Sequence, residues 1–331
     1  MNIYSHSNIK SLYVFGDIHG EFKQLFHKIK THAVKQIKNN ENEKLVDDIT
    51  LEQLQIHLED MSSIVSSKFY NYSYDIAKYL GHIENCVIIV GDCGFGFNKE
   101  EYYHQLFNKY HELLKKNNIY VYFVRGNHDD PSYFTDNKIN YEYIKTVSDY
   151  SVICVNDKNI LCVGGGLSID RIWRKQQEIK INKYKKTIEK KLYWENEMPI
   201  YSEDLLNEIQ NNDIKINIVI SHTSPHFVFP TKKDSLSYWA KLDKNLYKDI
   251  EIERNTLTSI FDFLTANKHP LTNWYYGHFH CNNTEKKQKV TFTAINELDI
   301  SKVKINNESE ESLKDFFDTL INTIDCSDEN I

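Results

Sequence analysis

The sequence predicts an α/β fold in which helices cover the strands and polar residues gather at the strand ends. Five short apolar runs are continuous rather than alternating, which is typical of strands that are buried on both faces. Each run is followed directly by a loop that contains Asp, Asn or His. Because open α/β sheets bind ligands beyond the carboxyl ends of their strands, we expect these five loops to form one site.

The predicted elements are spread over most of the chain. In order, residues 12–15 lead to Asp17 and His19, 87–90 to Asp92, 120–124 to Asn127 and His128, 216–220 to His222, and 274–276 to His278 and His280. Apolar residues at helical spacing predict helices over 22–29 and 257–264. Residues 151–163 are typical of a hairpin with a polar turn, and 290–295 of a closing strand.

Two regions do not fit this alternation. Residues 35–80 separate the first two loops by more than one crossover helix needs, and we expect a helical insertion there. Beyond a domain over 1–300, the acidic segment 301–331 carries apolar residues on one face of a predicted amphipathic helix or tail. That helix is expected to pack on its own domain; docking of a protein partner is the less favoured alternative.

The composition excludes several classes of protein. The chain has 331 residues, 40% of them hydrophobic, which is enough to bury a sizeable core. A net charge of −7 argues against a general nucleic-acid-coating role, so a nucleic-acid partner is not favoured. The six cysteines form no CxxC pair, and neither a secretory signal nor an apolar run long enough to span a membrane is evident. These features predict a reduced, cytoplasmic protein.

The residue types of the five loops are those of a metal site. Carboxylate, amide and imidazole ligands suit Mn²⁺, Fe or Zn²⁺, and a metal pair about 3.5–4 Å apart can hold both the attacking and leaving oxygens of a phosphoryl group. In the Asp-x-His string at Asp17 and His19, alternate side chains point to one side and can reach a single ion. Each string alone is weak evidence, since Gly-Asp usually marks a turn and a lone His is usually structural. Their combined order favours the metal site.

In order and residue type, the loops resemble the calcineurin-like metallophosphoesterase superfamily, from about residue 12 to about residue 295. The resemblance implies an αββα sandwich, with two facing mixed β-sheets flanked by helices, and two divalent metal ions. The implied ligands are Asp17, His19 and His280 for the first ion, Asn127, His222 and His278 for the second, and Asp92 as the bridge.

The resemblance also implies a mechanism, in which a bridging hydroxide attacks phosphorus without a phospho-enzyme. His128 follows a ligand but is not one in the family pattern, and it would donate a hydrogen bond or a proton to the leaving group. Asp129 could orient His128, unless the backbone sends its carboxylate elsewhere.

The strings at 16–20 and 125–128 resemble serine/threonine protein phosphatases, but the loop at 91–96 does not. That loop lacks the Asp and Arg with which the phosphatases orient the histidine and bind phosphate. The closer resemblance is to bacterial and phage calcineurin-like phosphoesterases, at residues 91–95, 164–171 and 194–199.

Three arginines are candidates to replace the missing phosphate ligand, because a guanidinium fits phosphate oxygens in a bidentate manner. They are Arg125, Arg171 and Arg174, and for Arg174 an ion pair with Asp170 or Glu195 is an equally weighted alternative. His226 is a further candidate to line the pocket.

We therefore expect a metal-dependent phosphoesterase acting on phosphomonoesters, either phosphoproteins or small molecules. The alternatives are a phosphodiesterase acting on nucleotides or nucleic-acid ends and, less favoured, a metal-binding scaffold.

Overall fold

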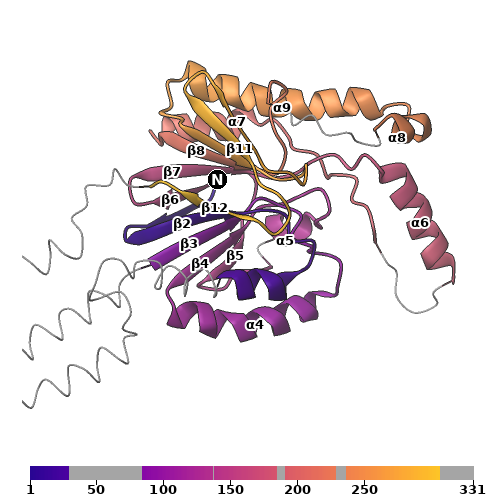
Figure 1. The fold of residues 1–331 in the computed structure, drawn as a ribbon, viewed down its shortest axis with the longest axis horizontal. Coiled ribbons are helices and arrows are strands. Elements are labelled where there is room, and N and C mark those ends of the chain that lie inside the picture. Colours follow the sequence, from indigo (N-terminus) through magenta and orange to yellow (C-terminus); the bar gives the residue numbers. More distant parts are fainter. Residues whose placement is uncertain (30–83, 137, 185–190, 229–235, 306–331) are drawn as a thin grey trace, which may run out of the picture.

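Two β-sheets face each other, and helices cover their outer faces (Figure 1). The computed structural model describes residues 1–29, 84–136, 138–184, 191–228 and 236–305. Both sheets contain parallel and antiparallel pairs, so they are mixed. The expected α/β sandwich with two facing mixed sheets is thereby confirmed. The expected insertion at 35–80 and the C-terminal helix lie outside the described residues.

The larger sheet has seven strands in the order β1-β6-β7-β8-β9-β11-β10. They are β1 (Ile3–His6), β6 (Ser151–Val155), β7 (Lys158–Val163), β8 (Ile216–Ser221), β9 (Asn273–Tyr276), β10 (Asn283–Lys287) and β11 (Val290–Ala294). The smaller sheet has five strands in the order β12-β2-β3-β4-β5. They are β2 (Ile9–Phe15), β3 (Glu84–Ile89), β4 (Ile119–Phe123), β5 (Ile144–Thr146) and β12 (Ile300–Val303).

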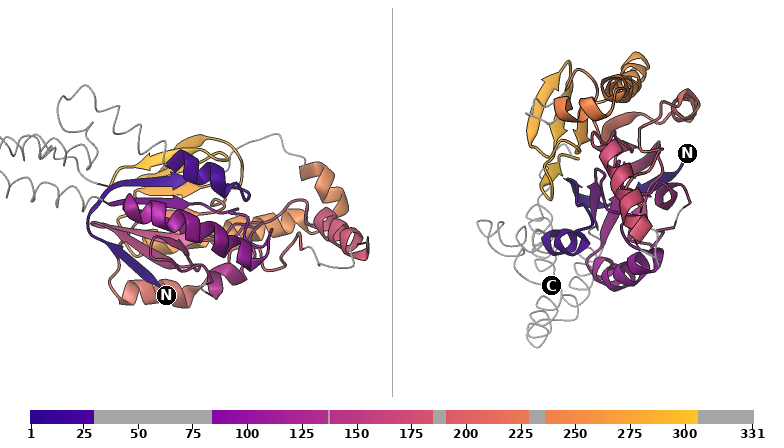
Figure 2. Two further views of the ribbon diagram at one scale, coloured as in Figure 1. Left: turned by 90° about the horizontal axis from the view of Figure 1, so that it is seen from below. Right: turned by 90° about the vertical axis from the view of Figure 1, so that its right-hand side faces the viewer.

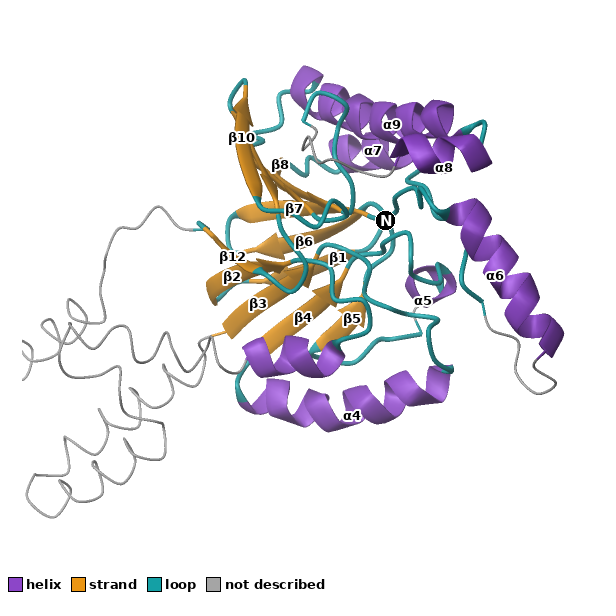
Figure 3. Ribbon diagram, turned by 45° about the vertical axis from the view of Figure 1, so that its right-hand side comes forward, coloured by secondary structure: helices purple, strands orange, loops and turns teal. Residues whose placement is uncertain are grey.

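The helices form two outer layers and one projection. Their bounds are α4 (Glu100–Lys116), α5 (Ser132–Thr135), α6 (Arg171–Tyr184), α7 (Glu203–Asn211), α8 (Leu236–Leu242) and α9 (Leu246–Ala266), and residues 22–29 are also helical. The helix at 22–29 and α4 cover the smaller sheet, while α7 and α9 cover the larger one (Figure 3). Helices α6 and α8 lie at one end of the sandwich (Figure 2).

Burial on both faces explains the continuous apolar runs. In β2, Leu12 and Val14 point into the cluster between the two sheets. The alternate residues Tyr13 and Phe15 point into the cluster under the helices. Because successive strand residues face opposite sides, a strand between two apolar layers needs apolar residues throughout.

The structure confirms the five predicted strands, the hairpin and the closing strand, with small shifts of their ends. The hairpin joins β6 to β7 through a two-residue turn at 156–157, since Val155 pairs with Lys158. Four strands were not predicted: β1, β5, β10 and β12. Strand β1 is half-exposed, β5 has only three residues, and β10 is polar and pairs antiparallel with β11. Strand β12 pairs with β2 and spans the expected boundary at residue 300.

The described cysteines Cys86, Cys93, Cys154, Cys162 and Cys281 all carry free thiols. Among the described helices, none has the length and hydrophobicity that a membrane crossing requires.

Candidate metal centre

The five loops meet at one edge of the sandwich because the strands that precede them run in parallel. Strands β2, β3 and β4 are parallel neighbours in the smaller sheet, and β8 and β9 are parallel neighbours in the larger sheet. At four of the expected ligands the backbone leaves the strand in the left-handed region: φ is 44° at His19, 45° at Asp92, 65° at His278 and 46° at His280. Three of these four residues, His19, Asp92 and His280, lie in one cluster of donors.

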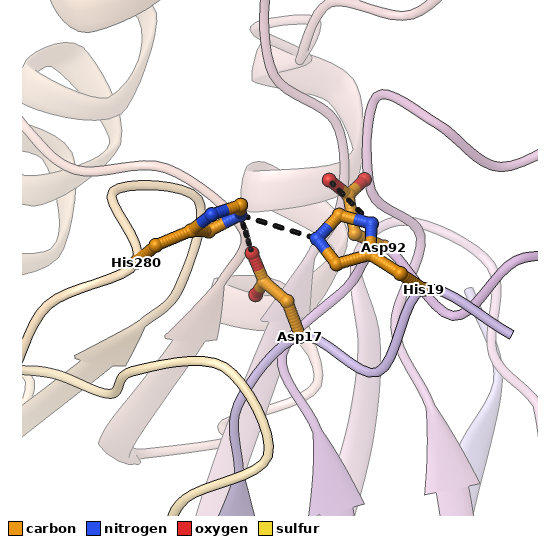
Figure 4. A group of neighbouring side chains, drawn as sticks. All are labelled: Asp17, His19, Asp92 and His280. Atoms are coloured by element: carbon orange, nitrogen blue, oxygen red, sulfur yellow. Dashed lines mark hydrogen bonds and ion pairs between the residues drawn. The ribbon is translucent and has the colours of Figure 1, made fainter. Parts of the chain in front are cut away.

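A first group of donors consists of Asp17, His19, Asp92 and His280 (Figure 4). One ligand atom from each lies within 4.8 Å of all the others. Nε2 of His280 is 3.1 Å from Nε2 of His19 and 3.2 Å from Oδ2 of Asp17. Carboxylate oxygens and imidazole nitrogens that converge in this way are the donor set of a borderline divalent cation.

A second group of donors lies on the other side of Asp92. Oδ1 of Asn127 is 2.8 Å from Nε2 of His222 and 3.0 Å from Nδ1 of His278. Nε2 of His222 is also 3.3 Å from Oδ1 of Asp92, whose other oxygen, Oδ2, lies 4.0 Å from Nδ1 of His19 in the first group. The two oxygens of Asp92 therefore face the two groups.

Close approach of backbone segments requires glycine beside both carboxylates. A Cβ atom on Gly126 would lie 2.1 Å from Oδ1 of Asp92, and one on Gly277 would lie 2.1 Å from Oδ1 of Asp17. Both distances are far below van der Waals contact. The glycines that recur in the ligand strings thus allow the carboxylates to be buried against neighbouring loops.

The charges of the site fit a bound cation. Asp17 and Asp92 are buried, and burying unpaired carboxylates is costly. Burial alone would lower the pKa of His222, but Asp92 and Asp17 outweigh it and raise that pKa to about 9. Burial and the neighbouring His222 both hold the pKa of His278 well below its ordinary value. The carboxylates therefore favour a positive charge close by, which a divalent ion would supply directly.

Asp129 has a different role from the one the sequence indicated. Its carboxylate accepts hydrogen bonds from the backbone N–H groups of Cys93, Gly94, Phe95 and Gly126. Oriented toward these amides, it ties the second ligand loop to the third instead of orienting His128. The adjacent sequence position placed Asp129 near His128, but the backbone turns the two side chains apart.

His128 contacts Arg174 instead. Nη2 of Arg174 lies 3.2 Å from Nε2 of His128, which is also 3.8 Å from Oδ2 of Asp92. Nε of Arg174 donates to Asp170 at 2.7 Å, so the expected ion pair and a contact with the site occur together. This places α6, through its first turn, beside the donor groups.

The other two arginines are bound by structural partners. Arg125 is 4% exposed and donates to Asp149 and to the backbone carbonyls at 196–198. Arg171 pairs with Asp243 and Asp249. Their guanidinium groups hold segments of the fold together, so the structure leaves only Arg174 of the three in contact with a candidate site residue.

His226 is exposed, and its backbone N–H donates to Thr258 of α9. Within the described part of the chain, no hydrogen bond or ion pair joins its ring to the donor groups. Sequence reasoning also missed three residues next to those groups: Ser168, Glu197 and Glu297. The sequence marked Ser168 and Glu197 only by their place in the strings at 164–171 and 194–199, which resemble bacterial and phage phosphoesterases.

The sequence matches a family model described as calcineurin-like phosphoesterase over residues 10–282. The chain therefore belongs to the calcineurin-like phosphoesterases, which makes it a metal-dependent phosphoester hydrolase. No curated protein matches the chain. Among solved structures, the phosphopantetheinyl hydrolase PptH from Mycobacterium tuberculosis is 15% identical, and the match covers 69% of this chain and 89% of that one with a TM-score of 0.32. A likeness this low carries no argument about substrate.

Proposed function

We propose that the chain is a phosphomonoesterase that uses two divalent ions sharing Asp92, with a phosphoprotein or a small molecule as substrate. The position of Asp92 carries this proposal, because its two oxygens face two separate donor groups. Asp17, His19 and His280 would complete the first position, and Asn127, His222 and His278 the second. Mn²⁺, Fe or Zn²⁺ in these positions would polarise the phosphoryl oxygens and lower the pKa of a water molecule that attacks phosphorus.

Arg174 is the residue that we propose to bind the phosphoryl oxygens. Its side chain is 25% exposed, so it can reach a ligand at the rim while Asp170 holds its Nε. A guanidinium presents paired N–H groups that match two oxygens of a phosphate. Arg171 is instead bound to Asp243 and Asp249, and Arg125 to Asp149 and backbone carbonyls, so both guanidinium groups are directed at structural partners rather than at the donor groups.

His128 would serve the leaving group. Arginine only donates, so Nε2 of His128 accepts the hydrogen bond from Arg174 and carries no proton in this arrangement. Burial lowers the pKa of His128 to about 4, although Asp92 opposes the shift. When Arg174 turns toward a phosphoryl oxygen, Nε2 is free to face the leaving-group oxygen, where it can take a proton from water and pass it to that oxygen.

The monoester assignment is supported by the phosphatase-like strings at 16–20 and 125–128. Free thiols support a cytoplasmic location, since disulfides are rare in that compartment. A protein partner for the C-terminal segment remains a prediction that falls outside the described residues.

Comparing p-nitrophenyl phosphate with bis-p-nitrophenyl phosphate in Mn²⁺ tests the proposal, with chelator-treated protein as the control. We expect faster hydrolysis of the monoester, and loss of activity with chelator. Faster hydrolysis of the diester would instead indicate a phosphodiesterase of nucleotides or nucleic-acid ends. A full-length chain that binds fewer than two ions and hydrolyses neither compound would indicate a scaffold.

A further inference from the structure

A hydrogen-bonded chain leads from Glu197 through Ser168 to Asn127. Oε1 of Glu197 accepts from the backbone N–H of Ser168 at 3.0 Å, and Oε2 accepts from its hydroxyl at 2.6 Å. Oγ of Ser168 in turn accepts from Nδ2 of Asn127 at 2.9 Å. All three residues are buried, with exposed fractions of 0%, 3% and 2% respectively.

The order of donors and acceptors fixes which way the Asn127 amide points. A hydroxyl has one hydrogen, and the hydroxyl of Ser168 gives it to Glu197. Toward Asn127 its oxygen can therefore only accept, so the amide must present its NH₂ group to Ser168. The amide oxygen then points the opposite way, toward His222 and His278.

Glu197 is itself anchored by the backbone around it. The carbonyl of Glu197 accepts from Arg125 at 2.9 Å and from the N–H of Gly166 at 3.0 Å. Arg125 follows β4 in the chain and leads directly into the string that contains Asn127. The segment around Glu197 is thus fastened to the same loop whose amide it orients.

We propose that Ser168 and Glu197 are positioning residues that keep the oxygen of the Asn127 amide directed at the second metal position. This inference rests on the proposed function, because that function supplies the second ion. Without Ser168 the amide NH₂ group keeps only its longer contacts with the ring of His128, at 3.3 and 3.4 Å, and the amide can turn to present hydrogens to the cation. Mutation of a residue that hydrogen-bonds to a metal ligand typically lowers metal affinity or activity by about 10- to 100-fold.

Metal titration of the full-length protein with Mn²⁺ tests the proposal. Burial raises the pKa of Glu197 to about 8, so the titration is run above that pH, where the carboxyl has no proton to donate. Wild-type protein should bind two ions. Ser168→Ala should keep the first ion and bind the second about 10- to 100-fold more weakly. Glu197→Gln should act in the same direction and provides a second route if Ser168→Ala does not fold.

The matched control is Ser151→Ala, which removes a buried serine of β6 whose hydroxyl contacts Ser148 and no metal ligand. It should bind both ions as the wild type does. The exchange coupling of a Mn²⁺ pair, seen by electron paramagnetic resonance, provides a second readout. The signal of the coupled pair should weaken in Ser168→Ala and persist in Ser151→Ala. A general loss of stability would not produce this difference between the two variants.

A cycle with Asn127→Asp isolates the mechanism, because a carboxylate has no N–H group to be held by Ser168. In that background Ser168→Ala should cause no further loss of the second ion. The proposal would be overturned if Ser168→Ala and Glu197→Gln both bound the two ions as tightly as the wild type. It would also be overturned if Ser168→Ala weakened binding of the second ion by the same factor in the Asn127→Asp background as in the wild type. If wild-type protein itself bound fewer than two ions, the proposed function would fail instead.

Discussion

The strand-end loops and helix α6 both bring side chains to the site, but they are supported in different ways. Asp17, Asp92 and His222 are buried between the two sheets and their loops. Helix α6, by contrast, has no buried residue over 171–183, and Trp173 and Ile179 are among its exposed side chains. These three candidate donors are therefore held by the core, whereas Arg174 is carried by an element that the core constrains little. The chemistry and the choice of substrate can thus depend on separate parts of the molecule.

The largest effect should come from the core side of this comparison. Asp92→Asn removes the charge that both donor groups share, and we expect kcat to fall by about 1,000-fold or more. Metal content should fall with it. Asp157→Asn, at an exposed turn between β6 and β7, is the control and should leave both unchanged. If Asp92→Asn still bound two ions and kept full activity, the proposal that two ions share the Asp92 carboxylate would be wrong.

Substitution of Arg174 tests the α6 side. Arg174→Ala should lower kcat/KM for a monoester by about 10- to 100-fold, the value of one or two charge-assisted hydrogen bonds. Its melting temperature should stay close to that of the wild type, because an ion pair near the surface such as that with Asp170 contributes little. Unchanged steady-state constants would show that Arg174 is only an ion-pair partner.

Arg171, three residues earlier, should give the opposite result. It is 13% exposed and holds Asp243 and Asp249, so Arg171→Ala leaves two carboxylates without their ion-pair partner, although Asp243 keeps a hydrogen bond from the backbone N–H of Asn245. We expect a loss of about 3 kcal/mol in the free energy of unfolding, measured with urea, and a nearly unchanged KM in the folded fraction. A large rise in KM with no loss of stability would instead indicate that Arg171 binds the substrate.

The smallest effect concerns the contact between α9 and the loop that leads into α6. Glu253 is buried and accepts from the backbone N–H of Leu167 at 2.7 Å, and burial raises its pKa from 4.5 to about 7. Because the folded pKa is the higher one, its contribution to stability is complete below pH 4.5 and is lost as the pH rises through 7. The melting temperature of Glu253→Gln should therefore rise relative to that of the wild type as the pH increases from 4.5 to 7. A constant difference across the range would contradict this.

The convergence of the strand-end loops could be predicted from the sequence, because each loop is a short string directly after a strand. Asp17 and His19 fall in one donor group because they are two residues apart in one such string. Ser168 and Glu197 could not be predicted in this way. They meet across 29 residues, in contacts that only the folded backbone creates.

Other misses have similar causes. Asp129 adjoins His128 in the sequence, yet the backbone amides of the neighbouring loop hold its carboxylate. Residue type alone also could not separate the three arginines, because a guanidinium suits a phosphate and a carboxylate equally well. Strand β10 is polar at an edge of the sheet, where no apolar run marks it.

The left-handed backbone at His19, Asp92, His278 and His280 has a consequence for engineering. Non-glycine residues in that region are disfavoured by about 1–2 kcal/mol each, so glycine at these positions would relax the loops. It would also delete a proposed metal donor at every one of them. A screen for thermal tolerance in the absence of metal would therefore tend to enrich inactive variants. Screens intended to keep the enzyme need the ion present throughout, because these four strained positions coincide with the proposed donors.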